Sequence, residues 1–220
     1  MAKVEEANRR QVRPLGRPHK LGPGEIGLRD KIMDAAVNIF SRKGIASASL
    51  KEISLAAGAT PAVIYYHFES KEKLILETLA SRFIPLMENV WTAVDESDDP
   101  LWIIAEMQRR LINIALKVPW FLSLWSREFV NIDGSLREYT ARNLPACSVK
   151  RLVAKIRQGQ MDGLINPDLS PEMLYMSIIG ATMIPLHSQS SWTRQFRKKI
   201  DADSIIKHVG IMLAYGYKGK

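Results

Sequence analysis

The sequence predicts an all-α protein with an N-terminal head of three helices followed by a bundle of the others, about nine helices in total. From residue 28 onward apolar residues recur at helical spacing, and no strand pattern interrupts them beyond residue 83. Glycine, proline, serine and aspartate gather between these segments, as they do in loops that separate helices. The 220 residues are enough for a buried core. The single cysteine, Cys147, cannot form an internal disulfide.

Residues 27–75 contain the signals for the head. The apolar stripe of residues 28–40 predicts its first helix, which has a basic last turn and ends before Gly44. Ser49 and Glu52 have the spacing of a capping box, which predicts the start of the second helix. A glycine shortly afterwards interrupts the apolar pattern, so the second helix is expected to be short.

The third helix is expected to begin after Thr60, whose side chain can cap it, with Pro61 in the first turn, where a helix tolerates proline. It should reach Phe68, after which Ser70 caps a fourth helix that runs through Phe83. A short helix, a glycine turn and a second short helix form the helix-turn-helix pattern. The second helix of this pattern can enter the major groove of DNA.

Residues 56–74, AAGATPAVIYYHFESKEKL, closely resemble the signature of the TetR (tetracycline-repressor) family of bacterial transcription regulators. The resemblance covers roughly residues 28–75. The positions that carry it are Ala35, Phe40, Gly44, Ile53, Ala56, Gly58, Tyr65, Tyr66, His67, Phe68, Lys71 and Leu74. It implies a homodimeric, ligand-responsive regulator that binds a two-fold symmetric DNA operator, with repression as the expected mode and activation as the alternative.

Four parts of the chain are expected to contact DNA. The first turn of the third helix, Thr60, Pro61 and Ala62, should face the base edges. The family resemblance implies that the phosphate backbone is held by Tyr66, His67 and Lys71. Proline and alanine offer bases only apolar contact, so specificity needs a supplement from Lys51, on the second helix, and from the N-terminal arm.

Residues 1–26 are expected to form a flexible basic arm, because residues 9–20 carry several basic side chains, no acidic one and almost no apolar content. The net charge of +8 leaves nucleic acid, an anionic membrane or an acidic ligand as candidate partners. The Gly16–Pro18 tripeptide resembles the core of an AT-hook, which would place Arg17, with Arg13 nearby, in a narrow A·T-rich minor groove. The alternative is a solvated tail.

Residues 76–220 are the expected ligand-binding and dimerisation bundle. Helices are expected at residues 101–118, 120–130, 135–160, 171–187 and 203–217, with a kink at Pro145 and breaks at 96–100, 133–134, 162–167 and 188–191. The segments 171–187 and 203–217 carry apolar residues on more than one face. One face can pack inward and the other requires a partner, so these two helices are expected to form the homodimer interface.

The family resemblance also implies a cavity for a small-molecule inducer inside the bundle. Methionine and tryptophan suit an adaptable apolar cavity, although most such side chains in a helical stripe belong to the packed core. The candidate lining residues are Met107, Trp120, Phe121, Trp125, Met176, Met183 and His187.

The sequence shows no catalytic constellation, cofactor motif or metal-ligand spacing, so an enzyme is not expected. Its apolar runs are shorter than the roughly 18 residues that span a bilayer, and its start resembles no export signal, so a cytoplasmic protein is expected. Two other functions stay open. One is a helical carrier whose head no longer binds DNA, and the other is a sequence-tolerant architectural DNA binder.

Overall fold

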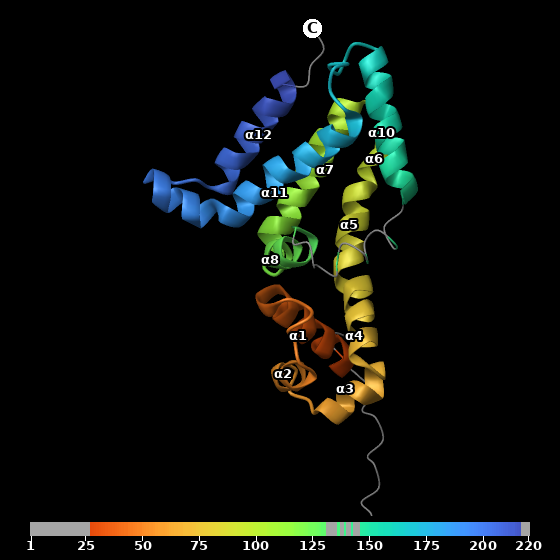
Figure 1. The fold of residues 1–220 in the computed structure, drawn as a ribbon, viewed down its shortest axis with the longest axis vertical. Helices are drawn as coiled ribbons and strands as arrows, with labels where there is room; N and C mark the ends of the chain where they lie inside the picture. The colour runs from red at the N-terminus through yellow and green to blue at the C-terminus, as the bar shows by residue number, and fades with distance from the viewer. Residues whose placement is uncertain (1–26, 131–135, 137–138, 140–141, 143–145, 217–220) are drawn as a thin grey trace, which may run out of the picture.

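The computed structural model describes residues 27–130, 136, 139, 142 and 146–216, and within them every regular element is a helix (Figure 1). The predicted all-α class is therefore confirmed. The elements are α1 (Leu28–Lys43), α2 (Leu50–Ala56), α3 (Pro61–Phe68), α4 (Lys71–Thr78), η1 (Leu79–Phe83), α5 (Ile84–Trp91), α6 (Ala93–Glu96), α7 (Pro100–Lys117), α8 (Phe121–Trp125), η2 (Ser126–Val130), α10 (Ala146–Met161), α11 (Pro171–Phe196) and α12 (Ala202–Gly216), where η marks a π-helix. None of these helices is long and apolar enough to cross a membrane. The arm, with Arg13 and Arg17, lies outside the described residues.

The head consists of α1, α2 and α3, packed around a small apolar core with the start of α4. Ser49 accepts a hydrogen bond from the backbone N–H of Glu52, whose side chain accepts from the backbone N–H of Ser49, so the predicted capping box is confirmed. Ser70 caps α4 as expected, by accepting from the N–H of Lys73. Thr60 holds the predicted N-cap position of α3, but its side chain forms no capping hydrogen bond.

A single helical rod connects the head to the bundle. Helices α4, η1 and α5 follow one another without a loop, and Figure 1 shows them as one continuous rod that rises from α3. The expected domain boundary after residue 75 falls inside this rod. Helix α5 of the bundle and helix α4, which contacts α3, therefore belong to one continuous helical segment.

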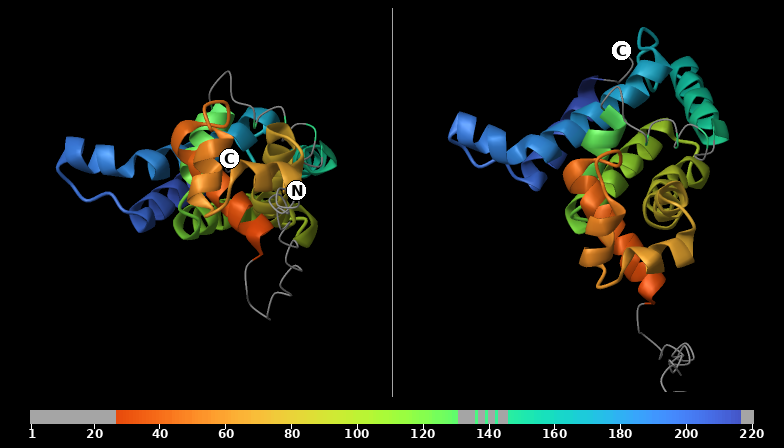
Figure 2. Two further views of the ribbon diagram at one scale, coloured as in Figure 1. Left: turned by 90° about the horizontal axis from the view of Figure 1, so that it is seen from below. Right: turned by 60° about the horizontal axis from the view of Figure 1, so that its bottom comes forward.

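The bundle packs α5, α7, α8, α10, α11 and α12 above the head. Helix α7 lies at its centre, because it contacts α5, α10, α11 and α12. Its N-cap is Asp99, whose side chain accepts from the N–H groups of Leu101 and Trp102, and Pro100 is its first residue. Figure 2 shows the C-terminal part of α11 and the start of α12 projecting from the body of the molecule.

The predicted end of a helix at His187 is wrong, because α11 continues to Phe196 through the segment that was expected to be a break. Side chains support the helix there: Ser188 donates to the carbonyl of Ile184 (2.7 Å) and accepts from the indole N–H of Trp192 (2.9 Å). The rings of Trp192 and Phe196 stack 5.5 Å apart. Ser188, one of the serines that suggested a loop, therefore has its hydroxyl satisfied within a helix. The expected kink at Pro145 lies outside the described residues.

Candidate DNA-contact surface and bundle cavity

Helix α3 presents its first turn to solvent. Ile64 and Phe68 are buried in the head and fix the inner face of the helix. Thr60, Pro61 and Ala62 are all exposed, and so is Lys51 of α2. Lys51 forms no ion pair with any described residue, so its charge is available to a partner. This surface matches the part of a helix-turn-helix that faces the base edges of DNA.

The second group of predicted DNA contacts lies where α3 passes into α4. Tyr66 is 84 % exposed, and its ring meets the edge of His67 at 5.3 Å. Glu69 adopts a positive φ of 64° that ends α3 and turns the chain into α4. Lys71, in the first turn of α4, donates through Nζ to the carbonyl of Ala46, 3.1 Å away in the loop between α1 and α2. This bond holds the ammonium group against the head.

Two apolar side chains on the head are exposed. Tyr65 of α3 is 55 % exposed, and Leu55 of α2 is 81 % exposed. Both residues fall outside the apolar stripe of their helix, which is the only signal in the sequence for their outward position.

Both ends of α1 are attached to the bundle by polar contacts. Near its start, the guanidinium of Arg82 in η1 pairs with Asp30 (2.8 Å) and Asp34 (2.7 Å). Burial works against the charged form of Arg82, but these two carboxylates outweigh it and raise the pKa of the guanidinium. Arg82 thus ties the start of α1 to η1.

The second attachment comes from η2, at the C-terminal end of α1. Arg127 donates to the carbonyl of Ser41 at 3.1 Å. Glu128, which is only 5 % exposed, accepts a 2.7 Å hydrogen bond from the backbone N–H of Ile45, just after α1. Gly44 has a positive φ of 87°, and a Cβ there would lie 3.0 Å from a Glu128 carboxylate oxygen, so this residue has to be glycine.

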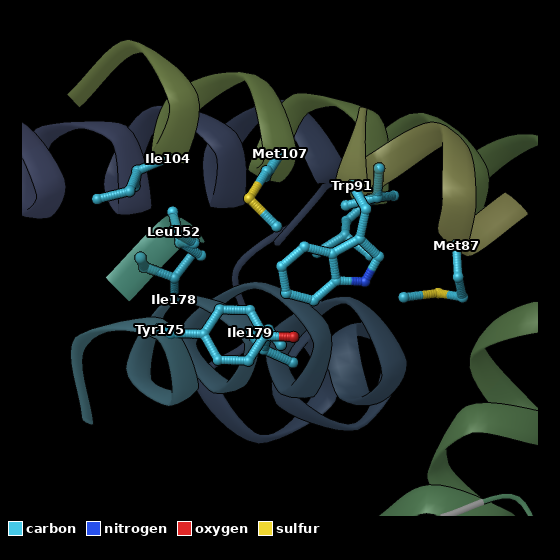
Figure 3. Close-up of a pocket in the computed structure, with 10 residues that line it drawn as sticks. Met87, Trp91, Ile104, Met107, Leu152, Tyr175, Ile178 and Ile179 are labelled. Atoms are coloured by element: carbon cyan, nitrogen blue, oxygen red, sulfur yellow. The ribbon is translucent and has the colours of Figure 1, made fainter. Parts of the chain in front are cut away.

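The bundle encloses a small apolar cavity between α5, α7, α10 and α11 (Figure 3). Its free space is about 20 Å³, enough for about one water molecule. Its walls are Met87, Val90 and Trp91 of α5, Ile104, Met107 and Leu111 of α7, Leu152 of α10, and Tyr175, Ile178 and Ile179 of α11. The rings of Trp91 and Tyr175 lie 5.4 Å apart at an angle of 42°. Burial strongly raises the pKa of the Tyr175 phenol, which is therefore neutral at physiological pH.

Of the predicted lining residues, only Met107 borders this cavity. Phe121 stacks on Phe83 (5.8 Å) and Trp125 on Phe129 (6.1 Å), so both belong to the core near α8. Of the others, Met183 is fully buried, Trp120 is partly buried, and Met176 and His187 are exposed.

Sequence reasoning missed Tyr175, because nothing in its helical spacing shows which of several apolar stripes faces a void. No cluster of histidine, cysteine, aspartate or glutamate in the described chain could hold a metal ion.

Residues 32–78 match the family model described as bacterial regulatory proteins of the tetR family. The HTH-type transcriptional regulator AcrR of Shigella flexneri is 47% identical over 164 residues, which cover 62% of this chain and 76% of the relative. The HTH-type transcriptional repressor NicS of Pseudomonas putida is 29% identical over 161 residues, 68% of this chain and 71% of the relative.

Solved structures have the same fold. The ketosteroid transcriptional regulator KstR2 of Mycobacterium tuberculosis matches with a TM-score of 0.68 and 19% identity, covering 90% of this chain and 98% of that one. The transcriptional regulator FadR of Bacillus subtilis, in complex with stearoyl-CoA, matches with a TM-score of 0.64 and 18% identity, covering 84% and 97%.

The bond from Glu128 to Ile45 predicts a specific loss of stability. Glu128→Ala leaves the buried N–H of Ile45 without its acceptor and should lower the free energy of unfolding by about 1–3 kcal/mol. Glu128→Gln keeps an acceptor oxygen and should cost less. The measurement is urea unfolding followed by circular dichroism, with the exposed Glu88→Ala as the control. If the Ala and Gln variants both behaved like the control, the attachment would be of no energetic importance.

Proposed function

The chain belongs to the tetR family of bacterial regulatory proteins and is an HTH-type transcriptional regulator, and on this basis we propose that it is a cytoplasmic repressor released from its operator by a small molecule. The observation that carries the proposal is the head surface. The first turn of α3 is open to solvent, while Ile64 and Phe68 anchor the opposite face in the core. A helix held in this way can enter a major groove without losing its packing.

In the proposed complex, Thr60, Pro61 and Ala62 lie against base edges. They form few hydrogen bonds, because Pro61 and Ala62 offer only apolar contact, for instance to a thymine methyl group. Tyr66, His67 and Lys71 hold the phosphates on either side of the groove. Lys51 supplements the readout, and Arg13 and Arg17 of the arm are proposed to lie in the adjacent minor groove.

The proposed active species is a homodimer that pairs through α11 and α12. Both helices leave large apolar side chains in solvent, although other faces of the same helices pack inward. The exposed residues are Met173, Met176, Ile184, Trp192, Phe196, Ile206, Ile211 and Met212. An apolar surface of this extent on a monomer marks an interaction site, and a two-fold pair would place two α3 helices on successive major grooves.

Release from DNA is proposed to be a population shift. A ligand in the bundle cavity favours an arrangement in which α5 is displaced, and the continuous rod of α5, η1 and α4 passes this displacement to the head. The spacing of the two recognition helices then no longer matches the operator.

Selection of bound sequences from a random DNA pool tests this function. A repressor of this kind should enrich a two-fold symmetric motif with half-sites about one helical turn apart. Retention of DNA without any enriched motif would favour the architectural binder, an alternative that the apolar first turn of α3 keeps open. A failure to retain DNA would favour the carrier bundle.

The phosphate contacts predict a loss of affinity that does not depend on sequence. Lys71→Ala should weaken binding to all DNA similarly and lower the slope of log affinity against log salt by about 1 per subunit, because one counterion-releasing contact is lost. Tyr66→Phe should weaken binding without changing the slope. Fluorescence anisotropy over a salt series measures both, with the exposed Lys199→Ala as control. A changed preferred sequence in either variant would contradict the assignment.

The dimer interface predicts the mass in solution. Light scattering at micromolar concentration should give about twice the chain mass of 24.8 kDa. The double change Ile184→Glu and Ile211→Glu should produce monomers, because it buries two carboxylates without partners in the interface. Leu76→Glu, an exposed position on α4, is the matched control and should remain dimeric. A monomeric wild-type chain would refute the interface.

A further inference from the structure

We propose that the cavity between α5, α7, α10 and α11 takes a neutral, mainly apolar molecule whose hydrogen-bond acceptor, such as a carbonyl oxygen, binds the indole N–H of Trp91. This inference rests on the proposed function, since the molecule would be the effector that releases DNA. It follows from the charge, the hydrogen bonding and the size of the cavity.

The walls of the cavity exclude a charged ligand. Among the described residues, none of the side chains that line it carries a carboxylate, ammonium, guanidinium or imidazole group. Of these wall residues only Tyr175 is ionisable, and burial raises the pKa of its phenol, so it stays uncharged. A carboxylate or amine entering this space would lose its hydration without gaining a partner, which is strongly unfavourable. A neutral ligand has no such cost.

The hydrogen-bonding groups of the cavity call for an acceptor on the ligand. Trp91 is only 4 % exposed, and its Nε1 has no hydrogen-bond partner within the described structure. An indole N–H can only donate, so the group that satisfies it must be an acceptor. In Figure 3 the indole nitrogen lies on the Met87 side of the Trp91 ring, and the Tyr175 hydroxyl lies below the indole. The hydroxyl can support the same ligand oxygen with a second hydrogen bond.

The size of the cavity requires it to open when the ligand binds. A volume of about 20 Å³ is far below the space that even a ten-atom molecule needs. Met87 and Met107 form part of the wall, and their unbranched side chains can adopt other rotamers at low cost. Since Met87 and Trp91 both belong to α5, a ligand that separates α5 from α11 acts directly on the rod that leads to the head.

Two series of isosteric probes test the inference by isothermal titration calorimetry on the full-length protein without DNA. The first series is acetophenone, its hydrocarbon isostere 2-phenylpropene, and benzoate. The second is 2-acetylnaphthalene, 2-isopropenylnaphthalene and 2-naphthoate. We expect the ketone of at least one series to bind about threefold to tenfold more tightly than its hydrocarbon, as one net hydrogen bond provides. The carboxylate should bind at least about 100-fold more weakly than the ketone.

Trp91→Phe removes the donor and keeps an aromatic ring, so the ratio of ketone to hydrocarbon affinity should fall to about one. This ratio is informative even if the smaller ring enlarges the cavity, because both probes gain the same space. Trp102→Phe, at a 41 % exposed position outside the cavity, should leave the ratio unchanged. Tyr175→Phe should reduce the ratio in part.

Three results would overturn the inference. They are a carboxylate that binds as tightly as its ketone, a ketone preference that survives in Trp91→Phe, and no binding of either ketone at 1 mM. The DNA selection described above separates this failure from that of the proposed function. A protein that enriches an operator but rejects the ketones is a regulator with a different ligand. A protein that binds a ketone but no DNA is a carrier.

Discussion

The position of the DNA-contact surface depends on how α1 is held by the two π-helical segments. Arg82 of η1 pairs with two aspartates near the start of α1, and Glu128 of η2 accepts from the buried N–H of Ile45 just after its end. A π-helical turn holds one more residue than an α-helical turn, which changes the direction of the side chains that follow. In both segments this irregularity accompanies a side chain that reaches the head. Since α2 packs on α1, and α3 packs on α2 and α4, the orientation of α3 follows from these contacts.

The rod of α4, η1 and α5 joins two sites that need different environments. Its lower end lies beside α3, whose exposed residues must stay hydrated until DNA binds, and its upper end carries Met87 and Trp91 into an apolar cavity. The buried indole N–H of Trp91 has no partner within the described residues, and such a group destabilises the closed bundle. A ligand acceptor that binds this N–H removes the cost, and it can do so only in the open arrangement of the bundle. The hydrogen bond to Nε1 of Trp91 thus adds to the affinity for the ligand. It also stabilises the open arrangement relative to the closed one, which is the free-energy difference that regulation requires.

Local chemistry made the head predictable from the sequence. The capping box at Ser49, the cap at Ser70 and Pro61 in the first turn of α3 each act within one helical turn, so their positions follow from spacing alone. The bundle was less predictable, because its features depend on distant contacts. The continuation of α11 past His187 depends on side-chain bonds around Ser188, which a serine-rich segment does not reveal. The pairing of Trp91 with Tyr175 joins helices separated by most of the bundle sequence.

The weak hydrogen-bonding capacity of the α3 first turn affects how the proposed regulator would respond to its ligand. Pro61 and Ala62 can gain only apolar contact with bases, so much of the binding free energy has to come from phosphates and from groove shape. Phosphate contacts depend on the distance between the two heads of a dimer, because the groups they meet are fixed along the duplex. A regulator that gains little from any one base pair is therefore unusually sensitive to a change in that distance. Under this proposal, the attachments at Arg82 and Glu128 limit both operator affinity and the ease of release, because they set how rigidly each head follows the bundle.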